Sequence, residues 1–305
     1  GGRLTVENAY AYSRFARTVL GTNNIDFRSR AASTEEAQFL ASRVAGRGMD
    51  VTYADLEAAR HVVLVSYEPE DETSVVFLRL RKAVRKRGLK VTTLAPFASR
   101  GTRKLSAELI PVAPGAEAQT LEAMELEEGT IILVGERAAC QPGLLSEVSS
   151  KAIRSGARLA WMPRRAGDMG AIATGCLPGL LPGGRPVSSA EARGDMAAAW
   201  GVGTLPTDPG LSATEQFASA QEGHLKAFLV AGVDPYDMPE ADSALHALRK
   251  SFVVHVSTRA NAVTEVADVV FPACLMEEQA GHFLNWEQRI RPVALVNEGT
   301  KHPMS

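Results

Sequence analysis

Cysteine is scarce in this 305-residue sequence, and the three that occur, Cys140, Cys176 and Cys274, are far apart. An odd number at wide spacing gives no disulfide framework and no C-x-x-C pair occurs, so a reducing compartment is expected. No uninterrupted apolar stretch approaches the ~18–20 residues that cross a bilayer, and no secretory signal with its apolar core is present. We therefore expect a soluble protein.

An excess of positive charge is missing too. Lys and Arg total 33 against 35 Asp and Glu, for a formal net charge of -2. This balance argues against a nucleic-acid partner, which usually requires a strong basic excess. The length lies near the point where one hydrophobic core gives way to two, so two packed lobes are expected. The opening Gly1-Gly2-Arg3 has no methionine, which indicates a piece of a longer polypeptide.

Short apolar runs alternate with segments of helical periodicity along most of the chain. The expected strands are 61–65, 90–94, 130–134, 157–161, 226–230, 252–256 and 267–271. The expected helices are 5–20, 33 to about 46 or 48, 74–87, 143–155, 189–200 and 240–250. The strands do not alternate between polar and apolar residues, which is typical of a parallel sheet covered by helices on both faces. The sequence predicts an α/β protein.

The best-marked catalytic and nucleotide-binding motifs are absent. There is no P-loop, no G-x-S-x-G and no H-E-x-x-H sequence. The turn after Val65 has no glycine-rich fingerprint and carries four carboxylates, in Glu68, Glu70, Asp71 and Glu72. Negative charges at a helix N-terminus would repel a phosphate, so phosphate binding is not expected at this turn.

Other polar residues permit both a structural and a functional interpretation. Arg164 and Arg165 follow a strand end, where they could clamp a carboxylate or phosphate or form ion pairs between lobes. His282 lies in a polar and aromatic context and could line a site. Glu277 and Glu278 could form an acid–base pair or a solvated face. The structural interpretation is favoured for each.

Two further features favour packing over chemistry. His255, inside an apolar strand, is expected to be a core histidine. The helix at 74–87 carries a dense basic set, interpreted as an exposed face or as a surface for an acidic partner: Arg79, Arg81, Lys82, Arg85, Lys86 and Arg87. The Gly- and Pro-rich segment 163–211 is expected to be functional or to serve in docking.

Several segments, in the same order along the chain, resemble the molybdopterin-oxidoreductase superfamily, and most closely its branch in the large iron–sulfur subunit of bacterial respiratory complex I. The resembling segments are Gly2-Arg3-Leu4-Thr5, Arg17 with GTNNIDFRSR at 21–30, FLRLRKAVRKRGLKV at 77–91, LAWMPRRAGDMGA at 159–171, LPGGRPV at 181–187, AGVDPYDMP at 231–239, and VTEVADVVFPA through GHFLNWEQR at 263–289. The resemblance implies two Rossmann-like three-layer lobes with mostly parallel sheets, as in formate dehydrogenase- and DMSO reductase-like proteins.

The resemblance also bears on cofactors. Members with an active molybdenum site carry an arginine, a variable residue, a cysteine or selenocysteine and a histidine just after the GTNNID-like stretch, where this sequence has Arg30-Ala31-Ala32-Ser33. The methyl group of Ala32 cannot donate an electron pair to a metal, so molybdenum is not expected. Iron–sulfur clusters typically need four close thiolates. The resemblance therefore implies clusters in the parent protein, upstream of Gly1, and no cofactor or metal in this chain.

By the same resemblance, loops like 232–237 and 281–289 line a pterin dinucleotide in family members that hold one. The candidates for a relic of that pocket are Arg164, Arg165, Asp234, His282 and Asn285. Asp234 stands where many members have asparagine, and a carboxylate is a poor neighbour for a pyrophosphate. No catalytic residue is expected.

The resemblance implies a cofactor-free scaffold domain of the proton-translocating NADH:quinone oxidoreductase, with no catalytic activity of its own. Its partners would be other peripheral-arm subunits of complex I, on the cytoplasmic face of the bacterial inner membrane, without direct membrane insertion. The expected domains are 1–55 with 127–305, interrupted by a smaller α/β lobe at 56–126.

Two alternatives remain open from the sequence. One is a molybdopterin-dependent oxidoreductase of the formate dehydrogenase type with an unusual metal ligand. The other is a small-molecule-binding α/β module that uses Arg164 and Arg165.

Overall fold

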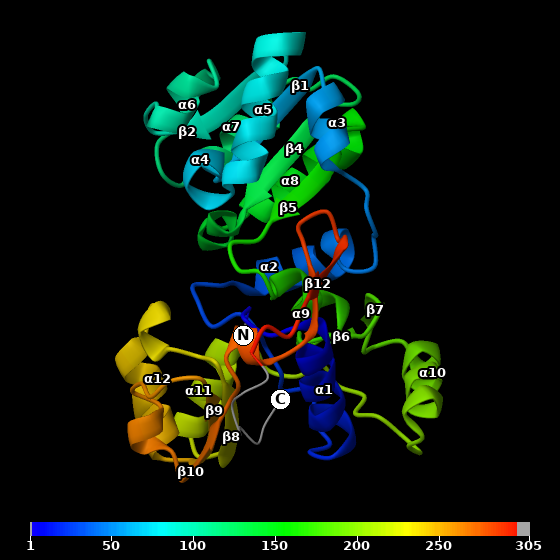
Figure 1. Cartoon of the computed structure of the whole chain (residues 1–305), viewed down its shortest axis with the longest axis vertical. Helices are drawn as coiled ribbons and strands as arrows, with labels where there is room; N and C mark the ends of the chain where they lie inside the picture. Colours follow the sequence, from blue (N-terminus) through cyan, green and yellow to red (C-terminus); the bar gives the residue numbers. More distant parts are fainter. Residues whose placement is uncertain (1, 298–305) are drawn as a thin grey trace. The chain divides into compact units, whose positions relative to one another are not determined.

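The computed structural model describes residues 2–297 (Figure 1). The chain divides into two compact units. Within the described residues, unit 1 contains 2–32, 165–285 and 290–297, and unit 2 contains 33–164 and 286–289.

Unit 2 is built on a five-stranded parallel sheet in the order β3-β2-β1-β4-β5. The strands are β1 (His61–Val65), β2 (Lys90–Ala95), β3 (Glu108–Pro111), β4 (Ile131–Gly135) and β5 (Arg158–Met162). The helices are α2 (Thr34–Phe39), the π-helix η1 (Leu40–Val44), α3 (Tyr53–Ala58), α4 (Pro69–Glu72), α5 (Ser74–Arg87), α6 (Arg100–Lys104), α7 (Glu117–Ala123), the 3₁₀ helix η2 (Glu136–Cys140) and α8 (Leu144–Ser155). The strand order reverses between β1 and β4, as in doubly wound folds.

Burial in the core explains why the strands of unit 2 consist of continuous apolar residues. Every residue of β4 is buried, and Val62 to Val65 of β1 are buried as well. Helix α5 buries Phe77 and Leu80 against this sheet, while α3 packs against α5 and α7 against α8. The expectation of an α/β protein with parallel sheets is confirmed.

The bounds of the compact units differ from the expected domain division at 56–126. Residue Val62 of β1 pairs with Ile131 of β4, so the strands on both sides of position 126 belong to one sheet. Hydrogen bonding between these strands places 33–164 in one unit. The turn 286–289 joins the same unit, since Trp286 packs edge-on against Tyr53 with ring centroids 5.0 Å apart.

Unit 1 contains a three-stranded parallel sheet in the order β10-β9-β8 and two short antiparallel pairs, β11-β12 and β6-β7. Its strands are β6 (Leu180–Leu181), β7 (Arg185–Pro186), β8 (Ala227–Ala231), β9 (Phe252–Ser257), β10 (Val269–Pro272), β11 (Gly281–Leu284) and β12 (Ile290–Val293). Its helices are α1 (Val6–Thr18), α9 (Asp168–Ala173), α10 (Ala190–Trp200), α11 (Ala213–Gln221) and α12 (Ala241–Arg249), with 3₁₀ turns η3 (Pro235–Asp237), η4 (Thr264–Val266) and η5 (Met276–Glu278).

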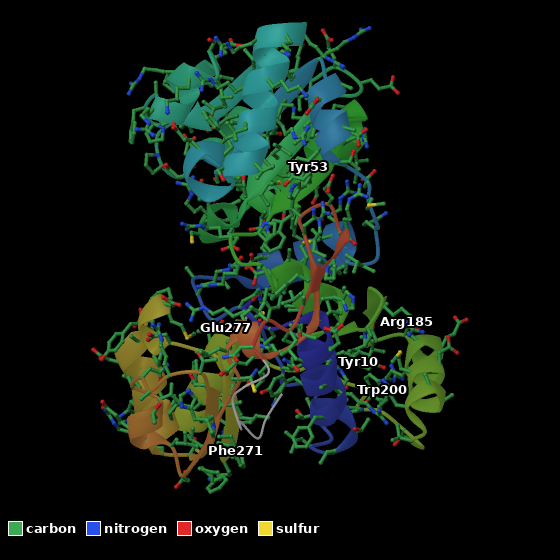
Figure 2. All side chains as sticks on the ribbon, viewed as in Figure 1. Tyr10, Tyr53, Arg185, Trp200, Phe271 and Glu277 are labelled. Atoms are coloured by element: carbon green, nitrogen blue, oxygen red, sulfur yellow. The ribbon has the colours of Figure 1, made fainter. Side chains whose placement is uncertain are left out.

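Helix α1 is the element on which much of unit 1 depends. Thr5 caps its N-terminus by accepting a hydrogen bond from the amide of Asn8 at 3.3 Å. It packs on α9 and β11. Helix α10 is fixed to it through Trp200, whose indole Nε1 donates to the Tyr10 hydroxyl at 2.6 Å (Figure 2).

Candidate functional site

Unit 1 contains a partly open, mainly apolar cavity of about 450 Å³. Its walls come from α1, the extended segment 22–29, α11 and the whole of strand β8. Apolar side chains that line it include Phe15, Leu20, Ile25, Phe217, Phe228 and Leu229. A cavity of this size and polarity falls within the range of ligand sites.

The helical period places Tyr12, Phe15 and Ala16 of α1 along the cavity. Phe15 and Leu20 remain 41% and 55% exposed, so this wall is not closed by the described residues. Burial raises the pKa of Tyr12 above its ordinary value of 10.0. Its phenol is therefore protonated at neutral pH and offers a neutral polar group at the wall.

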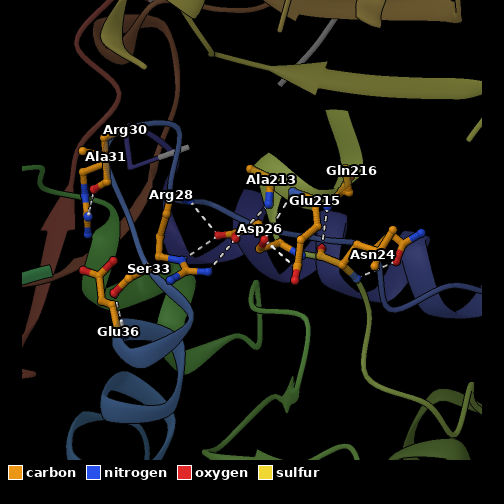
Figure 3. Close-up of polar contacts among 12 residues, drawn as sticks. Asn24, Asp26, Arg28, Arg30, Ala31, Ser33, Glu36, Ala213, Glu215 and Gln216 are labelled. Carbon is orange, nitrogen blue, oxygen red and sulfur yellow. Dashed lines mark hydrogen bonds and ion pairs between the residues drawn. The ribbon is translucent and has the colours of Figure 1, made fainter. Parts of the chain in front are cut away.

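Asp26 is the one charged side chain among the described lining residues, and it is neutralised by Arg28 (Figure 3). The Arg28 Nη2 atom lies 2.7 Å from Asp26 Oδ2 and Nε donates to Oδ1 at 3.0 Å, with both side chains 1% exposed. The amide of Ala213, at the start of α11, also donates to Asp26 Oδ2 at 3.2 Å. The cavity wall therefore carries no net charge from these groups.

Arg17, also buried, fixes α1 to the loops behind the cavity. Its guanidinium donates to Asn23 Oδ1 at 2.9 Å, and to the carbonyls of Leu177 and Leu180 at 3.2 and 2.7 Å. Asn23 in turn donates from Nδ2 to the carbonyl of Asp208 at 2.8 Å. Burial lowers the pKa of Arg17 to about 10, so the side chain stays charged at neutral pH. The acceptors of these hydrogen bonds are uncharged amide and carbonyl oxygens.

Arg164 and Arg165, for which the sequence left open a clamp or structural ion pairs, lie in different units. Arg164 belongs to unit 2, where its amide donates to Glu136 Oε1 at 2.7 Å and its Nε lies 3.8 Å from Glu72 Oε2. Arg165 belongs to unit 1, where its Nη2 lies 3.5 Å from Asp237 Oδ2. Each therefore has a carboxylate partner within its own unit.

The other three candidates lie in unit 1. Asp234 caps η3, because its Oδ1 accepts from the amide of Tyr236 at 3.1 Å. His282 Nδ1 lies 2.6 Å from Glu7 Oε1, and its amide donates to Glu7 Oε2 at 3.0 Å. Asn285 follows β11 and is half-buried. None of the five candidates is among the described lining residues of the cavity.

The interaction with His282 determines the direction in which the pKa of Glu7 shifts. Partial burial raises its pKa, but the hydrogen bonds from His282 outweigh burial and hold the pKa of Glu7 below its ordinary 4.5. A carboxylate bonded to histidine in this way connects α1 to β11. The contact fits a structural role for His282.

Sequence reasoning missed the residues that line the cavity. The alternation in Asp26-Phe27-Arg28 was a usable signal, because two opposite charges on one side of an extended segment can pair. The sequence predicted that α1 is a helix, but not that its apolar face lines a cavity. Its exposure depends on which elements cover it, and local periodicity does not contain that information.

The acidic turn of unit 2 is engaged in ion pairs. Glu72 Oε1 lies 2.8 Å from Arg137 Nη2, and Glu70 Oε1 lies 2.9 Å from Arg100 Nη2. At the end of β4, a Cβ on Gly135 would lie 2.5 Å from the carbonyl oxygen of Ser66. The carboxyl ends of β1 and β4, where open α/β sheets usually bind ligands, are thus closely packed and lined by acidic groups.

The donor atoms at position 32 and beside it do not fit a protein-ligated molybdenum centre. Ala32 provides no lone pair, and the hydroxyl of its neighbour Ser33 caps α2 by accepting from the amide of Glu36 at 3.1 Å. Burial raises the pKa of Cys176, so it is a thiol, and its Sγ donates to the carbonyl of Ala9 at 3.2 Å. Within residues 2–297 there is no group of three or more His, Cys, Asp or Glu placed to hold a metal.

Residues 1–298 match the Molybdopterin oxidoreductase family, and the chain belongs to this family. It is 50% identical over 300 residues to the G subunit of NADH-quinone oxidoreductase from Mycobacterium tuberculosis (strain CDC 1551 / Oshkosh), an alignment that covers 95% of this chain and 37% of that protein. The protein of the same name from Streptomyces coelicolor (strain ATCC BAA-471 / A3(2) / M145) is 48% identical over 322 residues, with 95% and 38% covered. The chain therefore spans less than two fifths of these relatives. The resemblance inferred from the sequence is confirmed.

The fold is also similar to that of a solved structure. Acetylene hydratase from Pelobacter acetylenicus aligns with 94% of this chain and 50% of its own, with a TM-score of 0.53 and 15% identity. At this identity the similarity concerns the fold alone. Among the described residues, no helix combines the length and hydropathy needed to span a bilayer.

Proposed function

We propose that this chain is a scaffold domain of the large iron–sulfur subunit of bacterial NADH-quinone oxidoreductase, respiratory complex I. The observation that carries the proposal is the 48–50% identity to the mycobacterial and Streptomyces proteins, sustained over 95% of the chain. The domain supports electron transfer from NADH to quinone by holding neighbouring parts of the complex in place, and performs no chemistry itself.

The chemistry of the donor atoms supports a scaffold role in preference to a redox role. Alanine occupies position 32, and the adjacent hydroxyl of Ser33 is committed to a helix cap. The paired Asp26 and Arg28 satisfy each other inside the cavity. Groups that could turn toward a cofactor are therefore used for local structure, Ser33 in unit 2 and the Asp26–Arg28 pair in unit 1.

The same proposal assigns structural roles to the five relic-pocket candidates. Arg164 and Arg165 hold carboxylates, Asp234 caps a turn, and His282 binds Glu7. Asn285 follows β11 and directly precedes the turn 286–289, which belongs to unit 2. No residue of the chain is assigned a catalytic role.

The cofactors and partners of the parent polypeptide follow from the proposed membership of complex I. Its iron–sulfur clusters are bound outside this chain, and its partners are the other peripheral-arm subunits. The complex is attached to the cytoplasmic face of the bacterial inner membrane, and this domain does not insert into the membrane.

The experiment compares the amount of assembled complex with its turnover. His282→Ala and Arg164→Ala are introduced into the parent polypeptide, and NADH-to-quinone activity is normalised to assembled complex. A scaffold predicts that activity per complex stays within about twofold of the parent, while the amount assembled falls with the stability of the domain. Trp286→Ala, which opens the core of unit 2, is the variant expected to reduce assembly most.

A selective fall in turnover per assembled complex would contradict the scaffold role, because it would place the substituted residue on the reaction path. Failure of the parent polypeptide to assemble with the other proteins of complex I would contradict the partner assignment.

A further inference from the structure

Helix α5 packs beside α3 in unit 2 and exposes both apolar and basic side chains to solvent (Figure 1). The helical period turns Leu78, Lys82 and Arg85 away from the core, at spacing i, i+4 and i+7. Leu78 is 58% exposed, and Val75, three residues before it, is 50% exposed. The opposite side of the helix holds its buried residues, which are Val76, Phe77, Leu80 and Ala83.

The basic residues of α5 have few carboxylates to balance them. The helix itself contains no Asp or Glu. Glu57 of α3 is shared by two of its cations, since Arg79 Nη1 and Lys82 Nζ lie 2.5 and 2.8 Å from its carboxylate oxygens. Among residues 2–297, no ion pair involves Arg85 or Lys86. An excess of positive charge therefore remains on the solvent side of the helix.

The stability of the helix does not account for this charge. Arg81 and Arg85 are four residues apart, as are Lys82 and Lys86, and like charges at this spacing destabilise a helix. The C-terminus of a helix favours cations within its last turn, which explains Arg85 and Lys86 but not the two cations of the preceding turn. An acidic partner would remove this repulsion.

The composition of the exposed side indicates what kind of partner fits it. Val75 and Leu78 are neighbours on the helix surface and lie one turn before Lys82. Phe77, the aromatic residue of α5, is buried, so the helix offers no ring on which a nucleic-acid base could stack. An acidic protein surface that includes apolar side chains matches both the charge and the apolar pair.

We propose that this side of α5 docks against an acidic surface of another protein of the same complex. The inference rests on the proposed function, which makes the chain part of a multisubunit complex, and adds the helix and the charge of the partner. Charge complementarity accelerates the encounter of separate chains and fixes their orientation, which favours a separate protein over a tethered part of the parent polypeptide. The proposed docking surface, called the α5 face, consists of Val75, Leu78, Lys82, Arg85 and Lys86.

The test treats the assembled complex with a water-soluble carbodiimide, which joins contacting amines and carboxylates as amides without a spacer. Lys86 is the reporter, because no carboxylate of the described chain pairs with it. Lys82 is the internal positive control, since its Nζ atom lies 2.8 Å from Glu57. Mass spectrometry should find Lys86 linked to Asp or Glu of another subunit, with a yield that falls about fivefold in about 0.5 M salt.

Lys86 left unlinked, in a sample where Lys82 is linked to Glu57, would overturn the proposal. A link from Lys86 to a second copy of this chain, or to the parent's own sequence, would overturn it as well, because the proposed partner is a separate protein. Normal assembly with Lys86 unlinked leaves the proposed function intact, whereas failure of the unaltered parent to assemble contradicts both.

A matched pair of charge reversals provides an independent readout. Arg85→Glu and Arg87→Glu both lie in the last turn of α5, so they change the net charge and the interaction with the helix dipole alike. Arg87 follows the buried Leu80 by seven residues and is therefore off the α5 face. Arg85→Glu should lower the recovery of the parent in the complex on the order of tenfold relative to Arg87→Glu.

The melting temperatures of the two purified parent variants should agree within about 2 °C, which separates docking from stability. Equal recovery of the two variants in the complex would contradict a role of the α5 face in docking.

Discussion

Arg17 illustrates how unit 1 uses a charged side chain for structure. It is 1% exposed and has carbonyl, hydroxyl and amide oxygens around its guanidinium. Such an arrangement is costly to disrupt, because removal of the donor leaves several buried acceptors without partners. Arginine suits this position because its planar fork can reach several acceptors at once.

We predict that Arg17→Ala lowers the free energy of unfolding of unit 1 by about 3 kcal/mol, the scale of stranded buried polar groups. Arg14→Ala, on the exposed face of the same helix, is the matched control: it removes one long hydrogen bond, from Nη2 to the carbonyl of Trp200 at 3.3 Å, and should change the free energy by no more than about 1 kcal/mol. Urea unfolding followed by far-ultraviolet circular dichroism measures both. Equal effects of the two substitutions would refute the role of Arg17.

His255 gives unit 1 a pH-dependent stability. It lies in β9 with 0% exposure, and its Nδ1 is 3.1 Å from the hydroxyl of Thr264. Burial lowers the pKa of His255 below the ordinary 6.5, so protons bind the unfolded chain more readily. Its contribution to stability is therefore complete above pH 6.5 and is lost as the pH falls below that value.

The corresponding prediction uses His255→Asn, whose amide can keep the bond to Thr264. Between pH 7 and pH 5, the free energy of unfolding should fall less steeply in this variant than in the original chain. Denaturant titrations at a series of pH values provide the measurement. Parallel pH profiles would show that His255 does not contribute.

At the scale of elements, the turn between β11 and β12 is a structural part of unit 2. Trp286 is 8% exposed within the core that includes Leu64 and Met162. Glu287 accepts from the amide of Tyr53, the first residue of α3, at 2.8 Å. A segment distant in sequence thus completes the core around α3.

We expect Trp286→Ala to destabilise unit 2 by about 3–5 kcal/mol, because it removes a large buried side chain and leaves a cavity. Ile290→Ala, at the start of β12 and 64% exposed, serves as the comparison and should have little effect. Fluorescence of a probe placed in unit 2 would report its unfolding midpoint. Similar midpoints for both variants would show that the turn does not support this unit.

Elements with strong local signals could be predicted from the sequence. The strand 61–65 and the helix 74–87 have the same bounds in the structure, and Ser33 caps a helix as its spacing predicted. The helix expected at 189–200 occurs as Ala190–Trp200. In each case periodicity and capping agree with the tertiary packing.

Elements that depend on distant partners were missed. Strand β3 (Glu108–Pro111) is short and half-exposed, and it is specified mainly by pairing with β2. Helix α3 has only six residues and relies on the turn at Trp286. The cavity has the same origin, since its walls come from segments separated by about 200 positions.

At the scale of the whole molecule, the central proposal is that a domain of the molybdopterin-oxidoreductase family serves complex I without a molybdenum centre of its own. The fold of the family is retained, while position 32 has no metal-binding side chain. Under this proposal, structure and redox chemistry are divided between this domain and the rest of the parent polypeptide.

Metal analysis of the purified parent polypeptide, assembled in its complex, tests this claim most directly. We predict iron and acid-labile sulfide in stoichiometric amounts, with molybdenum below about one tenth of an equivalent. Replacing Ala32 with Gly should leave all three contents unchanged, because its methyl group binds nothing. Molybdenum near one equivalent per polypeptide would contradict the account and favour an oxidoreductase of the formate dehydrogenase type.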